Sequence, residues 1–595
     1  MKSHAPRKTA RGPLAALAIA CLAVLGAVAF PAAASAATFS VTSTADTGPG
    51  SLRDAIALAN TNAGQDTITF GLPADSVIQL SSAIIITEGV SVDGAGTPGL
   101  VVTGQGGFGL LTLLVASPLA IDQDYSFSDL IFDGTAASTP GWQGAAITTS
   151  FGSTSHVARS LALTRITGRN IDGGLFPGPV LSDNVMQTGG PVTITDSTFT
   201  NNVSGSSTLN GGGAVYIRGT SGLVTVTGST FIGNTARTGG AIFIEGNAGG
   251  VPSLSVTSST FVNNTANGAP TVPAADGEGG AIAADTVADV TISGSTFTGN
   301  SAANDGGALS IGMLQLATSA VSISTSSFLG NHARSGGGAF WSATTQGDIS
   351  VTGSTFAGNT LSTNAVDAPL GNSIRLSGTG DHGLSIASST LDEAPGAAFS
   401  TWAIAVETTG ASPLTIAHST IVGPGAVAVR TLVGTSSSVT HSILWSLGTA
   451  DDALVALVSG LPGSNTIATS WSLSSGTAQP YLAVGSGNQF SVSNFGLGAL
   501  ANNGGPTQTR LPAVGSPAHD SGDPAIVGAP ATDQRGLTRV VQIIDIGAVE
   551  IQTVTLAATG TPVGLRVPLG GAVLILLGLL AVAVARRRFS ATDRG

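Results

Sequence analysis

The sequence predicts an all-β protein built as a parallel solenoid, and three observations support this prediction. A similar phrase recurs between about residues 120 and 440 at spacings of 28 to 36 residues. Within each copy, Val and Ile alternate with Thr and Ser, which is the period-two pattern of a half-buried strand. Only 9% of the residues are charged, and the 83 glycines have no three-residue period. This composition excludes a helical bundle and a collagen-like chain.

Residues 1–36 are predicted to be a signal peptide. A basic start precedes an apolar run from 14 to 30, and small residues follow up to Ala36. The single cysteine, Cys21, lies within the apolar run. We therefore expect the exported part to contain neither disulfides nor thiolate metal sites.

The body of the chain is strongly acidic. Between residues 37 and 555 there are 12 arginines, no lysine and 32 acidic residues, which gives a net charge near −20. Binding to phosphate groups requires clustered Lys and Arg. The composition therefore argues against nucleic acid or anionic lipid as a partner.

The repeats align on a bulky apolar residue that follows a Ser/Thr pair. This alignment gives one column: Phe132, Ile166, Phe199, Phe231, Phe261, Phe297, Phe328, Phe356, Leu391 and Ile421. Three residues after the phenylalanines comes a column of asparagines: Asn202, Asn234, Asn264, Asn300, Asn331 and Asn359. We expect an interior aromatic stack and a ladder of side-chain amides across a turn, where Asn tolerates left-handed backbone. A Gly-Gly-Ala sequence opens a second strand, and its glycines are expected to supply positive φ.

A repeat of this length holds only two or three short strands and cannot bury its apolar face alone, so copies must stack. A propeller blade would need four strands and about 40 residues. Leucines at the spacing of leucine-rich repeats are absent. The remaining prediction is a β-solenoid in which each repeat is one coil and neighbouring coils lie about 4.8 Å apart.

The pairing of Phe-x-x-Asn with Gly-Gly-Ala-Ile over 120–440 resembles the repeats of polymorphic outer-membrane proteins and related bacterial surface proteins. The resemblance implies a right-handed parallel β-helix of the pectate-lyase type, with repeats over 121–490 and an N-terminal cap and first coils over 37–120. "SLRDAIALAN" at 51–60 resembles a Cys-Ser-Leu-Arg-Glu-Ala motif of such proteins, with Gly50 in place of Cys and Asp54 in place of Glu. Ser51 and Asp54 form a capping-box-like start, so we expect a short helix that closes the N-terminal end of the rod.

Residues 502–550 closely resemble the terminal region of the choice-of-anchor Q family. The resemblance implies a C-terminal cap over 491–552 and a cell-surface protein. This region contains a charge cluster: Asp533, Arg535, Arg539, Asp545 and Glu550. The cluster fits either a cap tied by ion pairs or a ligand site.

The C-terminus resembles a sortase cell-wall sorting signal of high-GC Gram-positive bacteria. The motif is Leu556, Ala557, Ala558, Thr559 and Gly560, within a linker over 553–566. A predicted transmembrane helix over 567–585 and a cytoplasmic tail over 586–595 follow. The resemblance implies that a sortase thiolate attacks the Thr559 carbonyl and passes the chain to a peptidoglycan amine. The alternative is a permanent single-pass membrane anchor.

Candidate catalytic residues follow the Gly-Gly-Ala strands. Arg218, Glu245 and Asp285 occupy equivalent positions in successive coils, so Glu245 and Asp285 are expected about 5 Å apart, a separation compatible with retaining glycoside hydrolysis. An outward ion pair with an additional acid explains the pattern equally well.

Candidate carbohydrate contacts lie on the same strands, where the alternation turns Tyr216, Phe243 and Trp341 outward. Exposed aromatic side chains bind sugar rings by stacking, whereas the opposite strand phase would place them in the core.

A candidate calcium site is formed by closely spaced aspartates: Asp122, Asp124, Asp129 and Asp133. They lack the glycine-centred loop of an EF-hand. We predict no cofactor, with calcium as the one alternative.

Together these patterns predict an exported β-helix anchored to the cell wall or cell membrane. Its predicted role is that of a non-enzymatic adhesin or surface structural component that contacts a carbohydrate, a host surface or an environmental surface. The alternative is a polysaccharide lyase or glycoside hydrolase on the same scaffold, since the fold hosts both classes.

Overall fold

The computed structural model describes residues 35–552, with internal gaps at 115–122, 136–141, 151–157, 184–189, 205–209, 220–221, 248–249, 269–276, 313, 315–318, 344–346, 363–370, 379–381, 394–401, 409–411, 432–435, 448–453, 457–465 and 480–481. Within these residues, no helix is both long and apolar enough to cross a membrane. Most of the predicted signal peptide, the sorting motif, the predicted span over 567–585 and the tail lie outside them.

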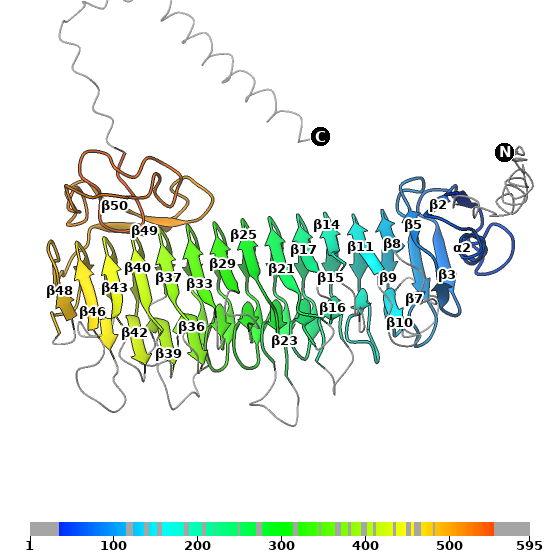
Figure 1. The fold of residues 1–595 in the computed structure, drawn as a ribbon, viewed down its shortest axis with the longest axis horizontal. Helices are drawn as coiled ribbons and strands as arrows, with labels where there is room; N and C mark the ends of the chain where they lie inside the picture. Colours follow the sequence, from blue (N-terminus) through cyan, green and yellow to red (C-terminus); the bar gives the residue numbers. More distant parts are fainter. Residues whose placement is uncertain are drawn as a thin grey trace, which may run out of the picture. The chain divides into compact units, whose positions relative to one another are not determined.

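The described chain is a parallel β-helix, and Figure 1 shows its strands in long rows along one rod. Three parallel sheets have 16, 14 and 13 strands and are called sheets A, B and C. From β2 to β45, each coil adds one strand to each of these three sheets, and each strand pairs with its equivalent in the next coil. A fourth sheet, D, has five short strands.

Sheet A contains β1 (Thr38–Val41), β2 (Asp66–Phe70), β5 (Val90–Asp93), β8 (Gln123–Ser128), β11 (Ala158–Thr164), β14 (Val192–Thr195), β17 (Leu223–Thr227), β21 (Ser253–Thr257), β25 (Val290–Ser293), β29 (Ala320–Ser324), β33 (Asp348–Thr352), β37 (Leu384–Ala387), β40 (Leu414–Ala417), β43 (Ser436–Thr440), β46 (Thr466–Ser470) and β48 (Leu482–Val484).

Sheet B contains β3 (Val77–Leu80), β6 (Val101–Gly104), β9 (Ile131–Asp133), β12 (Thr167–Arg169), β15 (Thr198–Thr200), β18 (Thr230–Ile232), β22 (Thr260–Val262), β26 (Thr296–Thr298), β30 (Ser327–Leu329), β34 (Thr355–Ala357), β38 (Thr390–Asp392), β41 (Thr420–Gly423), β44 (Ile443–Ser446) and β47 (Leu473–Ser474).

Sheet C contains β4 (Ile84–Ile86), β7 (Leu111–Leu114), β10 (Ile147–Ser150), β13 (Leu181–Asp183), β16 (Val215–Arg218), β20 (Ile242–Glu245), β24 (Ile282–Asp285), β28 (Leu309–Ile311), β32 (Phe340–Ser342), β36 (Gly371–Gly378), β39 (Trp402–Thr408), β42 (Gly425–Thr431) and β45 (Leu454–Ala456). Sheet D contains β19 (Thr235–Ala236), β23 (Thr265–Ala266), β27 (Ser301–Ala302), β31 (His332–Ala333) and β35 (Thr360–Leu361).

The phenylalanine column forms a stack inside the rod. Phe199, Phe231, Phe261, Phe297, Phe328 and Phe356 are all fully buried. Adjacent ring centroids lie 4.5 to 4.8 Å apart, close to the coil spacing. Each ring therefore packs on its equivalents in the coils before and after it, as parallel in-register strands require.

Ile166 does not belong to this column, which corrects the sequence alignment. Gly168 pairs with both Phe132 and Phe199, while Ile166 precedes it by two residues. A Cβ on Gly168 would lie 2.4 Å from Val180 Cγ2. Val180, which lies just before the sheet C strand of the same coil, thus fills the space that a phenylalanine occupies elsewhere.

The asparagine column forms a continuous amide ladder. Asn264 is typical, because its Oδ1 accepts hydrogen bonds from both the backbone N and Nδ2 of Asn234. Its Nδ2 donates to the Phe231 carbonyl and to Asn300 Oδ1. The amide is therefore fully hydrogen-bonded although it is fully buried.

The ladder asparagines themselves have no positive φ, which differs from the expectation. The residue before each has it instead: Asn201, Gly233, Asn263, Gly299, Gly330 and Gly358. These positions accept glycine or asparagine because both residue types tolerate left-handed backbone. In the Gly-Gly-Ala turns, positive φ occurs at Gly239, Gly279, Gly306 and Gly337.

A second ladder consists of serines that the sequence analysis did not single out. Ser259 is typical, because its Oγ accepts from the backbone N of Ser229 and donates to the Thr257 carbonyl. The pattern runs through Ser197, Ser229, Ser259, Ser295, Ser326, Ser354, Ser389, Ser419, Ser442 and Ser472. It satisfies the buried amides at the turn between sheets A and B.

The helix α2 (Leu52–Ala59) lies at the N-terminal end of the described rod (Figure 1). Ser51 Oγ accepts from the backbone N of Asp54, and Asp54 Oδ2 accepts from the backbone N of Gly50. Leu52, Ala55, Ile56 and Ala59 are buried in the same core as the strands.

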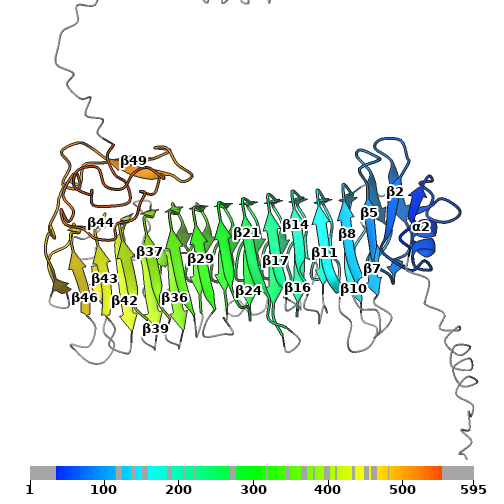
Figure 2. The same ribbon diagram turned by 45° about the horizontal axis from the view of Figure 1, so that its top comes forward.

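The segment 497–551, here called the strap, includes the antiparallel pair β49 (Leu497–Ala501) and β50 (Thr509–Pro512). Figures 1 and 2 show it along one side of the last coils. It hydrogen-bonds to residues as far apart in sequence as Gly353 and His441. We expected a cap on the end of the rod, whereas the strap covers the side of several coils over sheet B.

Candidate functional site

The candidate catalytic residues lie on the outer face of sheet C. In β16, Val215 and Ile217 face the core, so Tyr216 and Arg218 face outward. Arg218 pairs in register with Glu245, and Glu245 pairs with Asp285. The parallel register therefore brings the three side chains together in consecutive coils.

Glu245 is held by two neighbours from the preceding coil. Arg218 Nε lies 3.3 Å from Glu245 Oε2, and the Tyr216 hydroxyl lies 3.4 Å from the same oxygen. Burial and the nearby Glu245 carboxylate raise the pKa of Tyr216. Tyr216 therefore stays protonated at neutral pH and donates to Glu245.

Asp285 differs from Glu245, because no side chain among the described residues hydrogen-bonds to its carboxylate or pairs with it. Its neighbour in the next coil is Gly312, where an added Cβ would lie 2.6 Å from Asp285 Oδ1. The Asp285 side chain therefore packs against Gly312, and it stays partly exposed.

A polar pocket of about 180 Å³ adjoins Asp285. Its lining comes from four successive coils: Asn210, Thr238, Phe243, Glu278, Ala283, Ala284, Asp285, Ser310 and Gly312. The Ser310 hydroxyl lies 3.4 Å from Glu278 Oε2. Two carboxylates and several hydrogen-bonding groups thus converge on one hollow.

The three aromatic candidates do not form an exposed stripe, which corrects the sequence-based expectation. Tyr216 and Phe243 point away from the main core but are only 4% and 3% exposed, and they form a small separate cluster with Ala283. Their rings stack at 5.7 Å. Trp341 is partly buried and donates from Nε1 to Ser377 Oγ.

The sequence analysis missed a further charged group on this face. The Arg375 guanidinium lies 3.6 Å from Asp305 and 3.4 Å from Glu407. Burial raises the pKa of Asp305 to about 6, and Arg375 opposes this shift. Asp305 directly precedes a Gly-Gly turn, which was the one available sequence signal.

The candidate calcium ligands that the structure describes do not converge. Arg165 binds Asp129 through two hydrogen bonds and lowers its pKa. Asp133 pairs with Arg169, and Asp124 accepts from Ser160. Asp122 lies outside the described residues. Arginines thus neutralise Asp129 and Asp133, where calcium was the alternative that the sequence left open.

Within the described part of the chain, one group of potential metal ligands is close enough to share an ion. It consists of His519, Asp520 and Asp545, all in the strap. The Asp545 oxygens already accept hydrogen bonds from the backbone N of Asp520 and of Ile551. These two hydrogen bonds give the Asp545 carboxylate a structural role within the strap.

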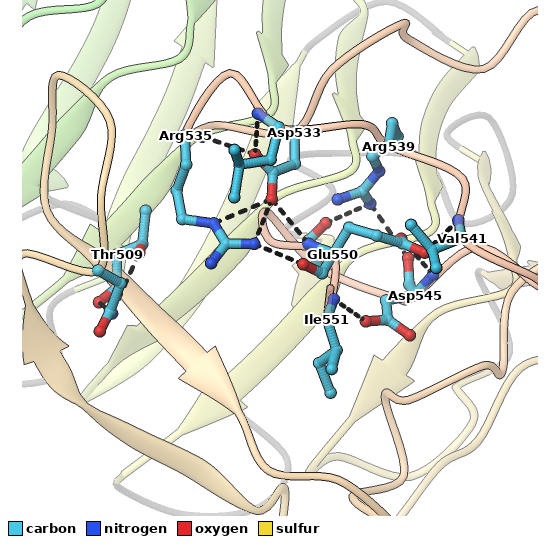
Figure 3. Close-up of polar contacts among 11 residues, drawn as sticks. Thr509, Asp533, Arg535, Arg539, Val541, Asp545, Glu550 and Ile551 are labelled. Carbon is cyan, nitrogen blue, oxygen red and sulfur yellow. Dashed lines mark hydrogen bonds and ion pairs between the residues drawn. The ribbon is translucent and has the colours of Figure 1, made fainter. Parts of the chain in front are cut away.

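The C-terminal charge cluster holds the strap together (Figure 3). Asp533 pairs with Arg535 at 2.8 Å and accepts from the backbone N of Glu550. The Glu550 carboxylate accepts from the backbone N of Val541 and of Asp545, and burial raises its pKa to about 7. Most partners in this network are backbone groups of the strap itself, which agrees with a structural role.

Arg539 joins this network to the rod. Its Nη2 donates to the carbonyls of Asp545 and Gly547 and lies 3.2 Å from His418 Nδ1. The side chain is fully buried, and burial lowers its pKa. Further contacts between strap and rod include the Arg510–Asp392 ion pair at 2.8 Å.

Comparisons with known proteins agree with the repeat architecture. The model of the Chlamydia polymorphic membrane protein repeat matches residues 196–218, 228–245, 258–285 and 294–312. No curated protein matches the chain. These segments contain parts of the phenylalanine, asparagine and serine columns described above.

Among solved structures, the chain is similar to the catalytic domain of a GH87 α-1,3-glucanase in complex with nigerose. The identity is 12%, the TM-score is 0.36, and the match covers 76% of this chain and 69% of that chain. A variant of that domain with tetrasaccharides gives 11% identity, the same TM-score and the same coverage.

Proposed function

We propose that the chain is an exported β-helix on the cell surface, where it acts as a non-enzymatic adhesin or a surface structural component. The observation that carries this proposal is the location of the repeated residues. The phenylalanine, asparagine and serine columns are buried in the rod, whereas the residues on the outer face of sheet C change from coil to coil. The repeat thus maintains a long scaffold, and variation is concentrated on its surface.

The proposed attachment rests on the C-terminal sequence. A sortase would cut between Thr559 and Gly560 and join Thr559 to peptidoglycan, which leaves the rod on the wall. The run 567–585 and the arginines after it would hold the precursor in the membrane before transfer. The sortase and the wall peptidoglycan are therefore the proposed partners in anchoring.

We further propose that α2 and the strap protect the rod. The exposed end of a sheet pairs readily with other chains, and α2 lies at that end with its apolar face in the core. The strap resembles the shared terminal region of choice-of-anchor Q proteins. Such a module would stabilise the coils nearest to the anchor.

An enzymatic function is the second candidate, and the register of Glu245 with Asp285 favours it. Glycoside hydrolysis needs one carboxyl group as an acid and another as a nucleophile or base. Against this role, the Glu245 carboxylate is already engaged by Arg218 and by the Tyr216 hydroxyl. The contacts support a surface ion pair more directly than a proton donor.

The experiment that separates the two functions measures binding and turnover in parallel. Cells that display the chain should adhere to glycan-coated surfaces, while the purified chain releases neither reducing ends nor unsaturated products from neutral or acidic polysaccharides. Glu245→Gln and Asp285→Asn serve as matched variants that preserve side-chain shape. Turnover by the wild type that either variant abolishes would overturn the non-enzymatic proposal.

A further inference from the structure

The pocket on sheet C arises where two columns of large residues are interrupted. The outermost column reads Tyr216, Phe243, Ala283, Ser310 and Trp341 in successive coils. The hollow lies beside Phe243, where the column continues with the small side chains of Ala283 and Ser310. In the adjoining column, Gly312 follows Asp285 and also lines the hollow.

The walls of this hollow combine apolar and polar groups. Phe243, Ala283 and Ser310 are almost completely buried. Asn210 and the partly exposed Glu278 and Asp285 supply polar groups. A site with one apolar wall and several oxygen acceptors suits a ring that has a C–H face and hydroxyl edges.

The size of the pocket limits the ligand. Its volume of about 180 Å³ is below the roughly 300–1,000 Å³ of pockets for drug-sized molecules. A single sugar ring is therefore the appropriate unit, and the rest of a glycan would extend along the rod.

The charge of the pocket limits the ligand further. Its described lining includes Glu278 and Asp285 but no basic side chain. Carboxylates accept hydrogen bonds from hydroxyl and ammonium groups and repel other carboxylates. The excess of acidic residues over arginine in the whole body acts in the same direction.

We propose that this pocket binds one hexopyranose unit of a surface glycan, neutral or amino-substituted but not a uronic acid. The apolar face of the ring packs on Phe243 and Ala283, and its hydroxyl or ammonium groups donate to Asp285 and Glu278. The inference rests on the proposed adhesin function and names the ligand class of its site.

The test uses the full chain in detergent and two variants. Ala283→Phe fills the pocket by continuing the Tyr216–Phe243 stack, and Asp285→Asn removes one charge at constant shape. Thr291→Phe is the control, because Thr291 lies on the exposed outer face of β25, in sheet A, shortly after β24. Calorimetric titrations use neutral hexoses, glucosamine and galacturonic acid as probes.

The wild type and Thr291→Phe should bind neutral hexoses or glucosamine, and galacturonic acid should not bind. Ala283→Phe should weaken binding at least tenfold. Asp285→Asn should weaken the binding of glucosamine more than the binding of neutral hexoses if the amino group contacts the carboxylate. If circular dichroism shows that Ala283→Phe does not fold, the Asp285→Asn variant alone decides the test. Binding of hexoses and glucosamine by that variant that equals wild-type binding would then overturn the inference.

Absence of hexose binding by the wild type, or preference for galacturonic acid, would also overturn the inference. Adhesion of displaying cells is measured separately. Adhesion that Ala283→Phe leaves unchanged would refute the pocket but not the adhesin function, whereas turnover of a glycan would refute the function itself.

Discussion

Nδ1 of His418 lies 3.2 Å from Nη2 of Arg539, and this contact joins the last coils of the rod to the strap. His418 stacks on His441, and the backbone N of Asp523 in the strap donates to Nε2 of His441. Both histidines must therefore be neutral for the strap to dock. Burial, followed by the nearby Arg539 charge, lowers the pKa of His418 to about 3 and also lowers the pKa of His441.

The first prediction is that acid weakens the strap contact. His418 has a folded pKa of about 3 against an ordinary value of 6.5, so protons bind preferentially to the unfolded state. The stabilisation that neutral His418 gives to the folded state is fully present above pH 6.5 and declines as the pH falls toward 3. At pH 4 the loss from His418 is about 3 kcal/mol. Glu550 has the opposite effect on stability between its ordinary pKa and about pH 7. Its folded pKa is raised, so the folded state binds the proton preferentially and a falling pH stabilises the fold in this range.

His418→Asn isolates this effect, because asparagine tolerates the positive φ of this position and still offers an acceptor. Urea unfolding followed by tryptophan fluorescence at pH 7 and pH 4 should show a smaller pH effect in this variant. An equal pH dependence in His418→Asn and wild type would contradict the proposed role of His418.

The second prediction concerns the amide ladder. Asn264→Ala removes the buried acceptor for the backbone N of Asn234 and one of the two acceptors for its Nδ2. It also removes the side-chain donor to the Phe231 carbonyl and to Asn300 Oδ1. The free energy of local opening should fall by about 3 kcal/mol. Hydrogen exchange in the adjacent coils measures this change. Asn263→Gly is the control, since neighbouring coils have glycine there, and equal protection in both variants would refute the ladder as a source of stability.

The third prediction concerns the aromatic stack. Phe297 lies between Phe261 and Phe328, and truncation to alanine creates a cavity in the core. Phe297→Ala should destabilise the protein by about 3–5 kcal/mol in urea unfolding. Phe297→Leu should cost less, because Leu391 occupies the same column in a later coil. A cost for leucine as large as that for alanine would argue against a column that tolerates aliphatic side chains.

The coil register was predictable because equivalent residues stack on one another in parallel in-register strands. Once the phenylalanines were aligned, the neighbours of Glu245 followed from counting along the strand. Gly168 was missed because the alignment searched for a bulky residue and the structure fills this position from Val180. The serine ladder was missed because serine is frequent throughout the chain and its burial is not visible in the alternation.

Contacts between distant segments were not predictable from the repeat. Gln534 bonds to Thr390 and Thr355, which lie 144 and 179 residues away. The burial of Tyr216 and Phe243 likewise depends on their packing with one another and with Ala283 on the outer face of sheet C, whereas alternation indicates only the direction of a side chain. A resemblance in the strap sequence indicated a terminal module but not the side of the rod on which it lies.

The most direct test of the surface-anchoring proposal is mass spectrometry of the mature C-terminus from native cells. Sortase transfer predicts a chain that ends at Thr559 in linkage to a peptidoglycan fragment and lacks the run 567–585. Thr559→Ala should keep the uncut chain in the membrane fraction. An intact peptide that crosses Thr559 and Gly560 in most of the wild-type protein would contradict wall sorting and indicate a permanent membrane anchor.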